Sequence, residues 1–506
     1  MYLQKQYKDF MGEISKDELY CGLLAHGLFS EKLPPAFTSE GFFNYCQSPH
    51  TQFQDQPHKY IHYENMRNIN VPRSLAIPNP MAYQLLCSFL RDHWNAFQTY
   101  FISRTQNQSY RVSRIHIRKM YGKPELFRMN YSNWRTDGSP EVDISFGKRY
   151  MVKADISSCF PSMYTHALSW ALATKEVAKQ QRNDKSLWFN QVDYRTRRMT
   201  HDETHGLLIG PHASNLLAEV ILVAIDEQLC KWQFVRAIDD YTCFVDSYEE
   251  GQKFLTDLGA SLRAFDLSLN HKKTEISKLP LAVTEQWQRK LNSLQLKTSY
   301  GKTDYILVRS FLDHAVELMH SSKENASILN YAIKVLSGED LTENAAEYCA
   351  KTIMNLSMLY PYLVAIMDEY VFMKYCRKCQ RHSCVQEYAK QIYRNGLLTN
   401  NYELVAYALF FAIKYKFEID EHTIENSIKS NDCVVLTLSV IYAREKGLVA
   451  DVRILKQRAQ ALANDTDSFD EFWLFLYETL PKSGLKGDWK PLKAANVTFV
   501  KPLSSW

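Results

Sequence analysis

The spacing of apolar residues changes near residue 300, and this change divides the chain into two predicted regions. Before it, apolar runs of strand length alternate with helical segments. After it, apolar positions recur at i, i+3 and i+4 with few strand signals. The later helical segments are 305–320, 325–337, 343–375, 384–394, 401–416, 422–429, 433–446, 450–464 and 468–478. They show no strict period, so the pattern predicts an irregular helical-repeat or bundle domain.

The earlier region mixes helical and strand signals, which predicts an α+β fold. The predicted elements are a helix from Ser15 to near Gly27, an extended stretch at 72–80, a helix at 81–97, a strand at 149–155, helices at 164–177 and 214–229, a hairpin at 234–245, a helix at 254–265 and a short strand at 267–269. From residue 149 onward the order is strand, helix, helix, hairpin, helix, strand. This order predicts a mostly antiparallel sheet.

Two neighbouring carboxylates interrupt the predicted hairpin. The run from Phe234 to Val245 consists of two β-favouring stretches separated by Asp239-Asp240, which suits a strand, a tight turn and a strand. Adjacent carboxylates at a turn repel each other, and a divalent cation would neutralise them. An Asp-Asp turn alone is more often a solvated hairpin tip, so a metal site needs further ligands elsewhere in the chain.

Composition is that of an ordinary globular protein. With 506 residues, 46% of them hydrophobic and 23% charged, the chain is long enough for two to four domains. The formal charge of +4 is mild, so nucleic-acid binding would have to come from local basic stripes. Eleven cysteines without framework spacing indicate a reducing cytosol. The N-terminus has no signal-peptide pattern, and the longest apolar run, Leu216–Ile225, is too short to span a bilayer. We therefore expect a cytoplasmic protein without membrane contact.

The stretch 103–153 is rich in cations, with aromatic residues among them. The cations are Arg104, Arg111, Arg114, Arg118, Lys119, Lys123, Arg128, Arg135, Lys148, Arg149 and Lys153, and the aromatics are Tyr110, Tyr121, Phe127, Tyr131 and Trp134. Basic residues interleaved with aromatics suit phosphates and stacked bases. A solvated basic face is an equally ordinary explanation, so the stretch favours nucleic-acid binding without deciding it.

Three carboxylates at strand ends could form one metal site. Asp155 ends the predicted strand at 149–155, and Asp239 and Asp240 lie at the hairpin tip. Carboxylates in this arrangement can hold two Mg²⁺ ions, which activate an attacking hydroxyl and stabilise a leaving pyrophosphate. Magnesium shares its coordination shell with substrate phosphates, so two or three protein carboxylates suffice.

Three further features have a role in such a site and also an ordinary alternative. Phe160 would lie beside the sugar of an incoming nucleotide, or it is a core residue. The glycine turn from Gly206 to Gly210 would let a nucleotide approach the backbone closely. Lys273 would reach the triphosphate or protonate the leaving pyrophosphate, or it is a solvated lysine.

Together these segments resemble the palm of reverse transcriptases. The run Asp155-Ile-Ser-Ser-Cys-Phe-Pro-Ser-Met-Tyr-Thr-His resembles the first aspartate motif of that family, and Gly206-Leu-Leu-Ile-Gly-Pro-His-Ala-Ser resembles its glycine-containing motif. Ala237-Ile-Asp-Asp resembles the double-aspartate motif, and Leu267-Ser-Leu-Asn-His-Lys-Lys-Thr resembles the lysine motif. Upstream, Pro72-Arg-Ser-Leu-Ala-Ile-Pro resembles the fingers motif. Ordered motifs over residues 60–280 make the resemblance specific.

The resemblance implies a nucleotidyltransferase that uses dNTPs. It implies catalytic roles for Asp155, Asp239, Asp240 and Lys273, two Mg²⁺ ions held by the three aspartates and by Ile156, and nucleotide contacts from Phe160, Gly210, Arg73, Arg111 and Arg114. The arginines are assigned by analogy with the fingers, and the sequence does not choose which of them meets the triphosphate. The implied architecture is a right-hand-like fingers and palm region over 1–290, with an N-terminal helical extension. An all-α, HEAT-like repeat domain over 291–506 would replace the thumb.

Finer features resemble one branch, the abortive-infection reverse transcriptases of bacteria (the AbiK-like group). The segments Pro161–His166 and Asp202–Gly206 are similar to that group, and the chain is short for it, which suggests its prophage-carried member. The resemblance implies an antiphage DNA polymerase that copies no template and is primed from a tyrosine hydroxyl. Its single-stranded DNA product would be covalently attached, and the protein would form a homo-oligomer, a trimer or hexamer. Candidate priming residues are Tyr7, Tyr20 and Tyr45, among 31 tyrosines.

Two positions depart from template-copying enzymes. Ala237 stands where they usually have an aromatic residue, and Leu208-Ile209 stands where they usually have Pro-Gln. Both positions are where a primer end and a template base would be gripped, so the departures fit relaxed or absent template use. A conventional RNA-templated (retron-like) enzyme and a non-catalytic defence scaffold are the alternatives, and the intact aspartates argue against the scaffold.

A run of cysteines after residue 375 raises the question of zinc. Cys376, Cys379, His382 and Cys384 have ligand chemistry, but four ligands within nine residues would need a tight loop. The helical pattern instead continues from Met367 into Val385. We therefore expect no zinc at this run.

Overall fold

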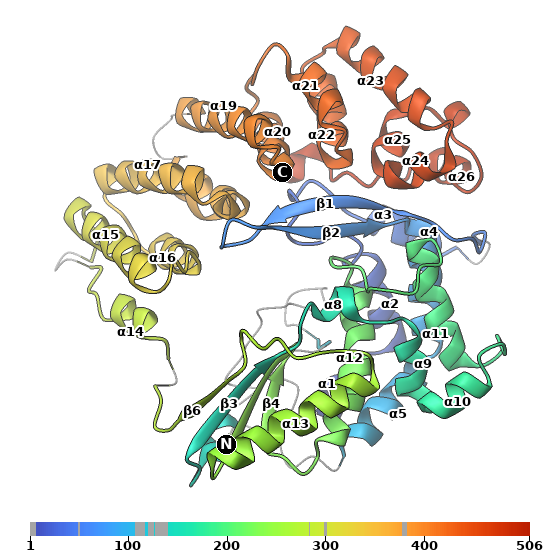
Figure 1. Cartoon of the computed structure of the whole chain (residues 1–506). Coiled ribbons are helices and arrows are strands. Elements are labelled where there is room, and N and C mark those ends of the chain that lie inside the picture. Colours follow the sequence, from blue (N-terminus) through green and yellow to red (C-terminus); the bar gives the residue numbers. More distant parts are fainter. Residues whose placement is uncertain are drawn as a thin grey trace.

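Figure 1 shows the arrangement of the chain in a computed structural model. The structure describes residues 7–48, 51–106, 117–119, 126, 140–282, 284–297, 301–376 and 382–506. Most of the basic stretch at 103–153, including Arg111 and Arg114, lies outside the described residues.

The N-terminal region is helical and then forms a hairpin. Its elements are α1 (Tyr7–Gly12), α2 (Lys16–Leu24), α3 (Glu40–Cys46), β1 (Tyr60–Met66), β2 (Pro72–Pro78), α4 (Pro80–Asp92) and α5 (Trp94–Thr105). A capping box begins α2, because the Ser15 hydroxyl accepts from the Glu18 N–H at 3.2 Å and the Ser15 N–H donates to Glu18 at 2.9 Å. The helix after Ser15 and the extended stretch at 72–80 are thus confirmed. The single helix expected at 81–97 is wrong, since His93 leaves helical geometry (φ −105°, ψ 12°) and separates two helices.

The second region contains a four-stranded antiparallel sheet in the order β4-β5-β3-β6. The strands are β3 (Tyr150–Asp155), β4 (Phe234–Ala237), β5 (Asp240–Val245) and β6 (Glu275–Lys278). The predicted strand at 149–155 and the hairpin are confirmed. The strand expected at 267–269 is wrong, because Leu269 forms only one isolated bridge, to Ile156. The chain first turns beside Asp155, where the Asn270 N–H donates to the Asp155 carbonyl at 2.8 Å, and only then pairs along β3.

Helices pack around this sheet. They are α7 (Pro140–Ser145), α8 (Cys159–Ser162), α9 (His166–Ala173), α10 (Lys175–Gln180), α11 (Trp188–Arg197), α12 (His212–Gln228) and α13 (Tyr248–Ala264), with a short 3-10 turn at Arg198–Thr200. As its apolar sequence predicts, α12 is buried along almost its whole length, between α5, α9 and α13. The helix expected at 164–177 is divided at Thr174, whose φ is +111°.

The remainder of the described chain is helical. Its elements are α14 (Gln286–Asn292), α15 (Tyr305–Ser321), α16 (Ser327–Ser337), α17 (Glu343–Leu359), α18 (Val364–Met367), a π-helix at Asp368–Cys376, α19 (His382–Thr399), α20 (Tyr402–Lys414), α21 (Thr423–Ser430), α22 (Cys433–Glu445), α23 (Val449–Leu462), α24 (Thr466–Glu471), α25 (Trp473–Thr479) and α26 (Trp489–Ala494). The expected helical character is confirmed. The segment 343–375 is broken because Pro361 disfavours helix at the residue before it.

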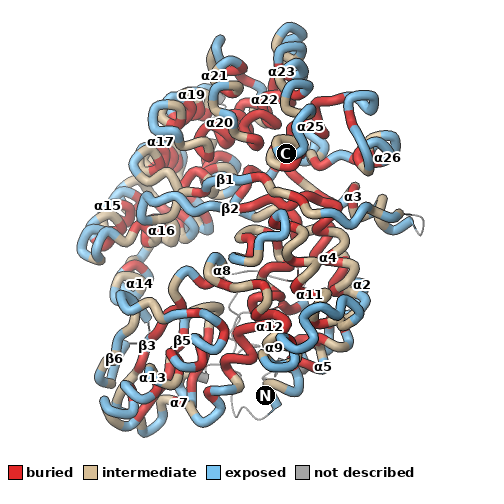
Figure 2. Tube along the Cα trace, turned by 45° about the vertical axis from the view of Figure 1, so that its right-hand side comes forward, coloured by how far each residue is buried: buried red, intermediate tan, exposed pale blue. Residues whose placement is uncertain are grey.

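The C-terminal helices pack against the β1–β2 hairpin, so the two regions share one continuous apolar core. Figure 2 shows buried residues running from α12 through the hairpin into α20 and α22. A segment near the C-terminus also contacts the N-terminal region, since Phe37 and Val500 form an antiparallel bridge. No helix in the described part of the chain is long and apolar enough to cross a membrane.

Candidate active site

The three predicted aspartates meet at one edge of the four-stranded sheet. Asp155 ends β3 and lies directly opposite Asp240, the first residue of β5. Asp239 precedes it in the turn, and its carbonyl accepts from the Ile156 N–H at 3.2 Å. The pairing of two antiparallel strands therefore gathers all three carboxylates, as the sequence pattern indicated.

The turn that carries Asp239 has an unusual backbone. Ala237 pairs with Asp240, so Ile238 and Asp239 form a two-residue loop. Ile238 has a φ of +59°, which is rare for a β-branched residue because its side chain crowds the backbone. A backbone of this kind costs of order 1–3 kcal/mol and persists where the surroundings hold it in place.

Arg236 holds that turn, a role that the sequence pattern did not predict. Its side chain is completely buried and donates to the carbonyl of Ile238 at 3.0 Å. It also donates to two carboxylates of α12, at 3.0 Å and 3.1 Å to Glu219 and at 2.7 Å to Asp226. The Tyr241 hydroxyl donates to Asp226 at 3.0 Å and completes the network. A signal was present, because an arginine within an apolar strand and two acids within an apolar helix require one another.

Asp155 is held by two neighbours from the segment before β6. Its side chain is 4% exposed, and Lys273 Nζ lies 2.6 Å from its Oδ2. The Asn270 amide donates to Oδ1 at 2.9 Å, a second contact that the sequence pattern did not predict. The hydrogen bond to Asp155 raises the pKa of the Lys273 ammonium. Lys273 is thus charged and sits beside the carboxylates.

The pKa values of the other two aspartates are raised. Burial and the charge of Asp155 raise the pKa of Asp239. Burial, Asp239 and Asp155 together raise the pKa of Asp240 to about 6. Three carboxylates face two cations, Lys273 and Arg73, so the local charge is negative.

The donor set fits Mg²⁺, which prefers carboxylate and carbonyl oxygens. Asp155, Asp239, Asp240 and the Ile156 carbonyl would hold such ions. Burial and mutual repulsion raise the pKa values of Asp239 and Asp240, and a divalent cation would offset the repulsion. The side chains as they lie do not enclose a metal, since the described residues contain no group of three or more His, Cys, Asp or Glu close enough to hold one. Substrate phosphates would complete the coordination.

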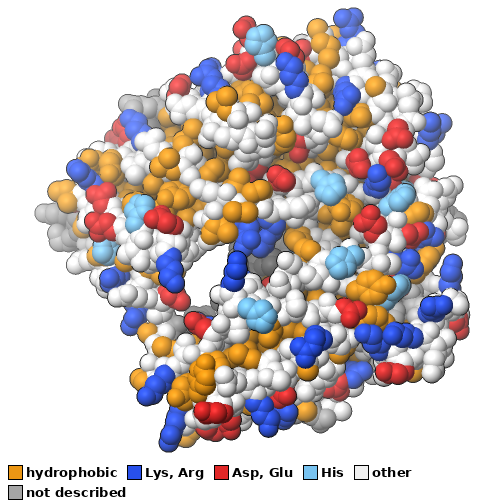
Figure 3. All heavy atoms as spheres, in the orientation of Figure 1, with side chains coloured by type: hydrophobic (Ala, Val, Ile, Leu, Met, Phe, Trp, Pro, Cys, Tyr) orange, Lys and Arg blue, Asp and Glu red, His pale blue; other side chains and the backbone are white. Residues whose placement is uncertain are grey.

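A cavity of about 690 Å³ lies in front of Asp155 and Asp239. Its described lining includes Phe160, Gly210 and Lys273. These predicted site residues therefore share one cavity with Asp155 and Asp239. On this face of the molecule, Figure 3 shows a hollow below the β1–β2 hairpin, with Lys and Arg side chains at its rim.

The β1–β2 hairpin contributes cations to the same cavity. Arg73 and Arg67 line it, together with Lys32 from the N-terminal region. Burial and the neighbouring Arg67 lower the pKa of Arg73, whereas Asp239 acts in the opposite direction. Two neighbouring arginines that repel each other form a suitable site for a polyanion. Arg118, in contrast, is buried over the Phe10 ring.

The glycine turn packs directly on β2. The Ala76 N–H donates to the Ile209 carbonyl at 2.8 Å, and Gly210 has a φ of +133°. A Cβ atom at Gly210 would lie 2.8 Å from the Ala76 carbonyl oxygen. Only glycine fits this contact, which joins the hairpin to the glycine turn at the cavity wall.

The tyrosines chosen from the sequence lie at different depths. Tyr20 is 3% exposed and its hydroxyl accepts from Gln84 at 3.1 Å, whereas Tyr45 is half-buried on α3. Tyr7 begins α1, and its side chain lies outside the described part of the structure. Among the described residues that line the cavity, Tyr60 is the one tyrosine.

The cysteine run is only partly described. Cys379 lies outside the described residues, as does the side chain of His382. The sulfur atoms of Cys376 and Cys384 lie 3.8 Å apart, at the two ends of the undescribed stretch.

Comparison with known proteins supports a polymerase domain. Residues 104–306 match the family model described as reverse transcriptase (RNA-dependent DNA polymerase). The matched segment contains all three aspartates and Lys273. No curated protein matches the chain.

Solved structures similar to the chain include telomerases of Candida. An apo telomerase from Candida tropicalis is 12% identical, with a TM-score of 0.33, over 83% of this chain and 72% of that chain. A form of it truncated from the C-terminal domain is 14% identical, with a TM-score of 0.31, over 49% of this chain and 55% of that chain. A Candida albicans telomerase in complex with a fragment of telomeric RNA is 12% identical, with a TM-score of 0.29, over 61% and 59%. The chain thus spans less than two thirds of the length of the last two.

Proposed function

We propose that this chain, a nucleotidyltransferase by virtue of the reverse transcriptase domain at residues 104–306, adds deoxynucleotides in the cavity beside Asp155. The main support for this proposal is that Asp155, Asp239 and Asp240 lie together at one edge of the sheet, within the matched domain. These residues would hold the Mg²⁺ ions, which supply charge stabilisation and an activated attacking hydroxyl.

The surrounding side chains have separate tasks in the proposed reaction. Arg73 and Arg67 would bind the triphosphate from the hairpin side of the cavity. Lys273, kept charged by Asp155, would give a proton to the leaving pyrophosphate. Phe160 would pack against the sugar, and the bare backbone at Gly210 would let the nucleotide approach the wall.

We further propose that synthesis is independent of a template. Ala237 offers no ring beside the aspartates on which a primer end could rest. The hydrogen bond from Ala76 to Ile209 joins the hairpin to the glycine turn, where a templating base would otherwise be gripped. Both features restrict the grip on a template while the nucleotide cavity stays intact.

Protein priming is the third part of the proposal. A priming hydroxyl has to reach the aspartates, and Tyr60 is the cavity-lining tyrosine of the described residues. Tyr7, Tyr20 and Tyr45 remain candidates if the N-terminal region moves or a second subunit supplies it. A product attached to the protein would suit an antiphage role of the abortive-infection type in the cytoplasm, with homo-oligomers of three or six subunits.

The helical region is proposed to be a HEAT-like repeat in place of a thumb, over residues 291–506. Neighbouring helices pack in pairs, as do α15 with α16 and α19 with α20, which supports this proposal.

The deciding experiment omits nucleic acid. Purified protein with Mg²⁺ and labelled dNTPs should yield DNA that stays bound to the chain in denaturant and is reduced to a peptide adduct by protease. The double variant Asp239→Asn/Asp240→Asn should be inactive. Asp246→Asn, which removes an exposed carboxylate paired with Lys148, is the matched control and should be active. Inactivity of the wild type under all conditions would refute the polymerase itself.

A conventional RNA-templated enzyme of retron-like type is the second candidate, favoured by the description of the matching family model. It predicts synthesis only after an RNA template and a primer are added, and no protein adduct.

The priming residue of the protein-primed reaction can be identified by substitution. If Tyr60 is the primer, Tyr60→Phe should abolish labelling of the protein. Labelling that persists in Tyr60→Phe and stops in Tyr45→Phe would instead place the priming residue on α3.

A further inference from the structure

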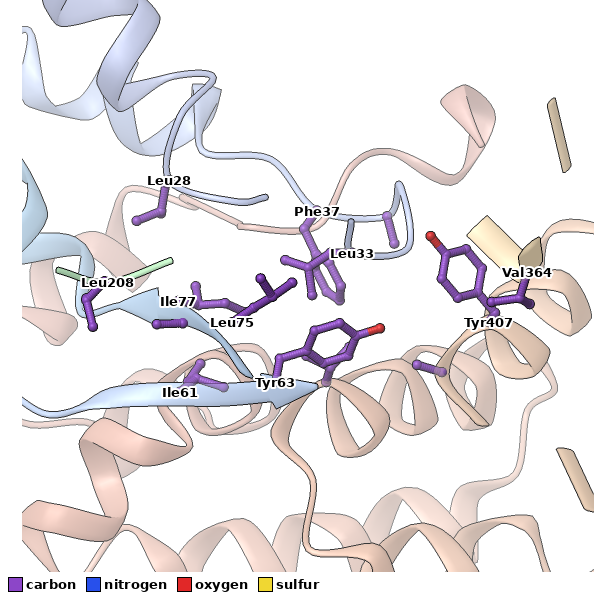
Figure 4. Close-up of a cluster of buried hydrophobic side chains, with 14 of the residues drawn as sticks. Leu28, Leu33, Phe37, Ile61, Tyr63, Leu75, Ile77, Leu208, Val364 and Tyr407 are labelled. Carbon is purple, nitrogen blue, oxygen red and sulfur yellow. The ribbon is translucent and has the colours of Figure 1, made fainter. Parts of the chain in front are cut away.

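The β1–β2 hairpin is enclosed from two sides. Figure 4 shows Ile61, Tyr63, Leu75 and Ile77 of the hairpin, Leu208 of the glycine turn, and Val364 and Tyr407 of the C-terminal helices within one apolar cluster. The hairpin that carries Arg73 is thus packed against helices that are distant in the sequence.

One charged residue crosses this apolar contact. Glu403, on α20, is 1% exposed and accepts two hydrogen bonds from β1. The Asn65 amide donates to one carboxylate oxygen at 2.5 Å, and the Met66 N–H donates to the other at 2.6 Å. Both oxygens of Glu403 are therefore used to hold two successive residues of β1.

Asn65 and Met66 lie opposite the part of β2 that carries Arg73, the proposed triphosphate ligand. In the antiparallel register Asn65 pairs with Arg73, and Met66 pairs with Pro72. Residues directly opposite in such a pair have Cβ atoms about 4.5–5.5 Å apart on one face of the ribbon. A displacement of Asn65 would therefore displace Arg73.

Holding a strand with a buried carboxylate carries a desolvation penalty. Burial raises the pKa of Glu403 to about 7, although its hydrogen bonds with Met66 and Asn65 act in the opposite direction. Apolar side chains fill the same contact around it, and they would stabilise packing without a desolvation penalty. What an apolar residue cannot supply is a fixed direction for two donors, which specifies one position of the strand.

We propose that Glu403 is a positioning residue, through which the C-terminal helices fix the β1–β2 hairpin so that Arg73 meets the nucleotide triphosphate. The inference rests on the proposed function of Arg73. It gives the helical region a task in nucleotide binding, performed from behind the cavity wall.

The variant Glu403→Gln tests this with little change of volume. A glutamine side chain has one acceptor oxygen, and its amide would face a donor of β1, so one of the two hydrogen bonds is lost and replaced by a repulsive contact. Tyr388→Phe is the matched control, because it removes a buried 2.8 Å contact with Ser357 in the same helical region, away from the hairpin.

Two measurements separate positioning from general stability. Glu403→Gln should raise the KM for dNTPs about fivefold with kcat within twofold, as expected for the loss of roughly one hydrogen bond in binding. It should weaken equilibrium binding of dATP, measured with Ca²⁺ in place of Mg²⁺, by the same factor. Tyr388→Phe should lower the melting temperature about as much as Glu403→Gln does, but it should leave the KM for dNTPs and the affinity for dATP unchanged.

The outcomes distinguish the inference from the proposed function. If the wild type is active and Glu403→Gln has the same KM for dNTPs as the wild type, the inference alone is overturned. The same holds if Tyr388→Phe raises the KM for dNTPs as much as Glu403→Gln does. A wild type that neither incorporates nor binds dATP would overturn both. If Glu403→Gln does not fold, Glu403→Asp keeps the carboxylate but withdraws it from the two donors of β1, and it should weaken dATP binding.

Discussion

Replacement of Arg236 by methionine should be among the most damaging single changes in the molecule. The guanidinium is completely buried and serves two carboxylates, Glu219 and Asp226, together with the carbonyl of Ile238. Methionine fills the space but donates nothing, so two buried carboxylates lose the cation that they share. Removing one partner of a buried ion pair typically costs about 3–5 kcal/mol.

The assay is thermal unfolding at two pH values. With about 2–4 °C per kcal/mol for domains of this size, Arg236→Met should melt roughly 6–20 °C below the wild type at pH 8. Burial already raises the pKa of Asp226 despite the arginine. Without the arginine a carboxylate would take up a proton as the pH falls, so the deficit should shrink at pH 5.5.

The control is Arg309→Met, which removes an exposed arginine 3.8 Å from Asp313 on α15. Exposed pairs of this kind contribute about 0.3–0.5 kcal/mol, so its melting temperature should barely change. Equal melting temperatures of the two variants would contradict a stabilising role of Arg236. A role in holding the turn is contradicted if Arg236→Met incorporates nucleotides at the wild-type rate well below its melting temperature, because the Ile238 carbonyl would then need no donor.

Three other predictions concern the site and its surroundings. Asp240→Asn should abolish nucleotide incorporation while leaving the melting temperature equal or higher, because it removes a charge whose burial and repulsion by Asp239 and Asp155 raise the pKa of Asp240 to about 6; a marked loss of stability would contradict this. Gly210→Ala should cost about 1–3 kcal/mol and reduce incorporation, since its Cβ meets the Ala76 carbonyl, whereas Gly301→Ala, with φ +78° and open space, should affect stability alone. The pKa of Glu403 rises from 4.5 to about 7 on folding, so its contribution to stability, up to about 3 kcal/mol, is present below pH 4.5 and lost as the pH rises through 7. Melting temperatures between pH 5 and 8 should show this decline in the wild type and less of it in Glu403→Gln.

Local chemistry explains why much of the site could be predicted. A strand that ends in Asp155 and a hairpin interrupted by Asp239-Asp240 are features of short segments, and the antiparallel pairing of those segments brings the carboxylates together. The helix after Ser15 was predictable for the same reason, because its capping box lies within four residues. Segment boundaries were less predictable where tertiary contacts intervene, as at the turn beside Asp155 that moves β6 beyond Lys273.

The helical and strand segments, the aspartates and the kind of chemistry they suit could therefore be read from the amino-acid sequence. The distant groups that hold these elements emerge only from the folded chain: Arg236 beneath the aspartate turn, Asn270 on Asp155, and Glu403 against the strand opposite Arg73. The physical reason is that periodicity and turn chemistry act over a few residues, whereas the partner of a buried charge depends on how separate elements pack. An arginine or glutamate within an apolar segment indicates that a partner exists, but the identity of that partner follows only from the fold.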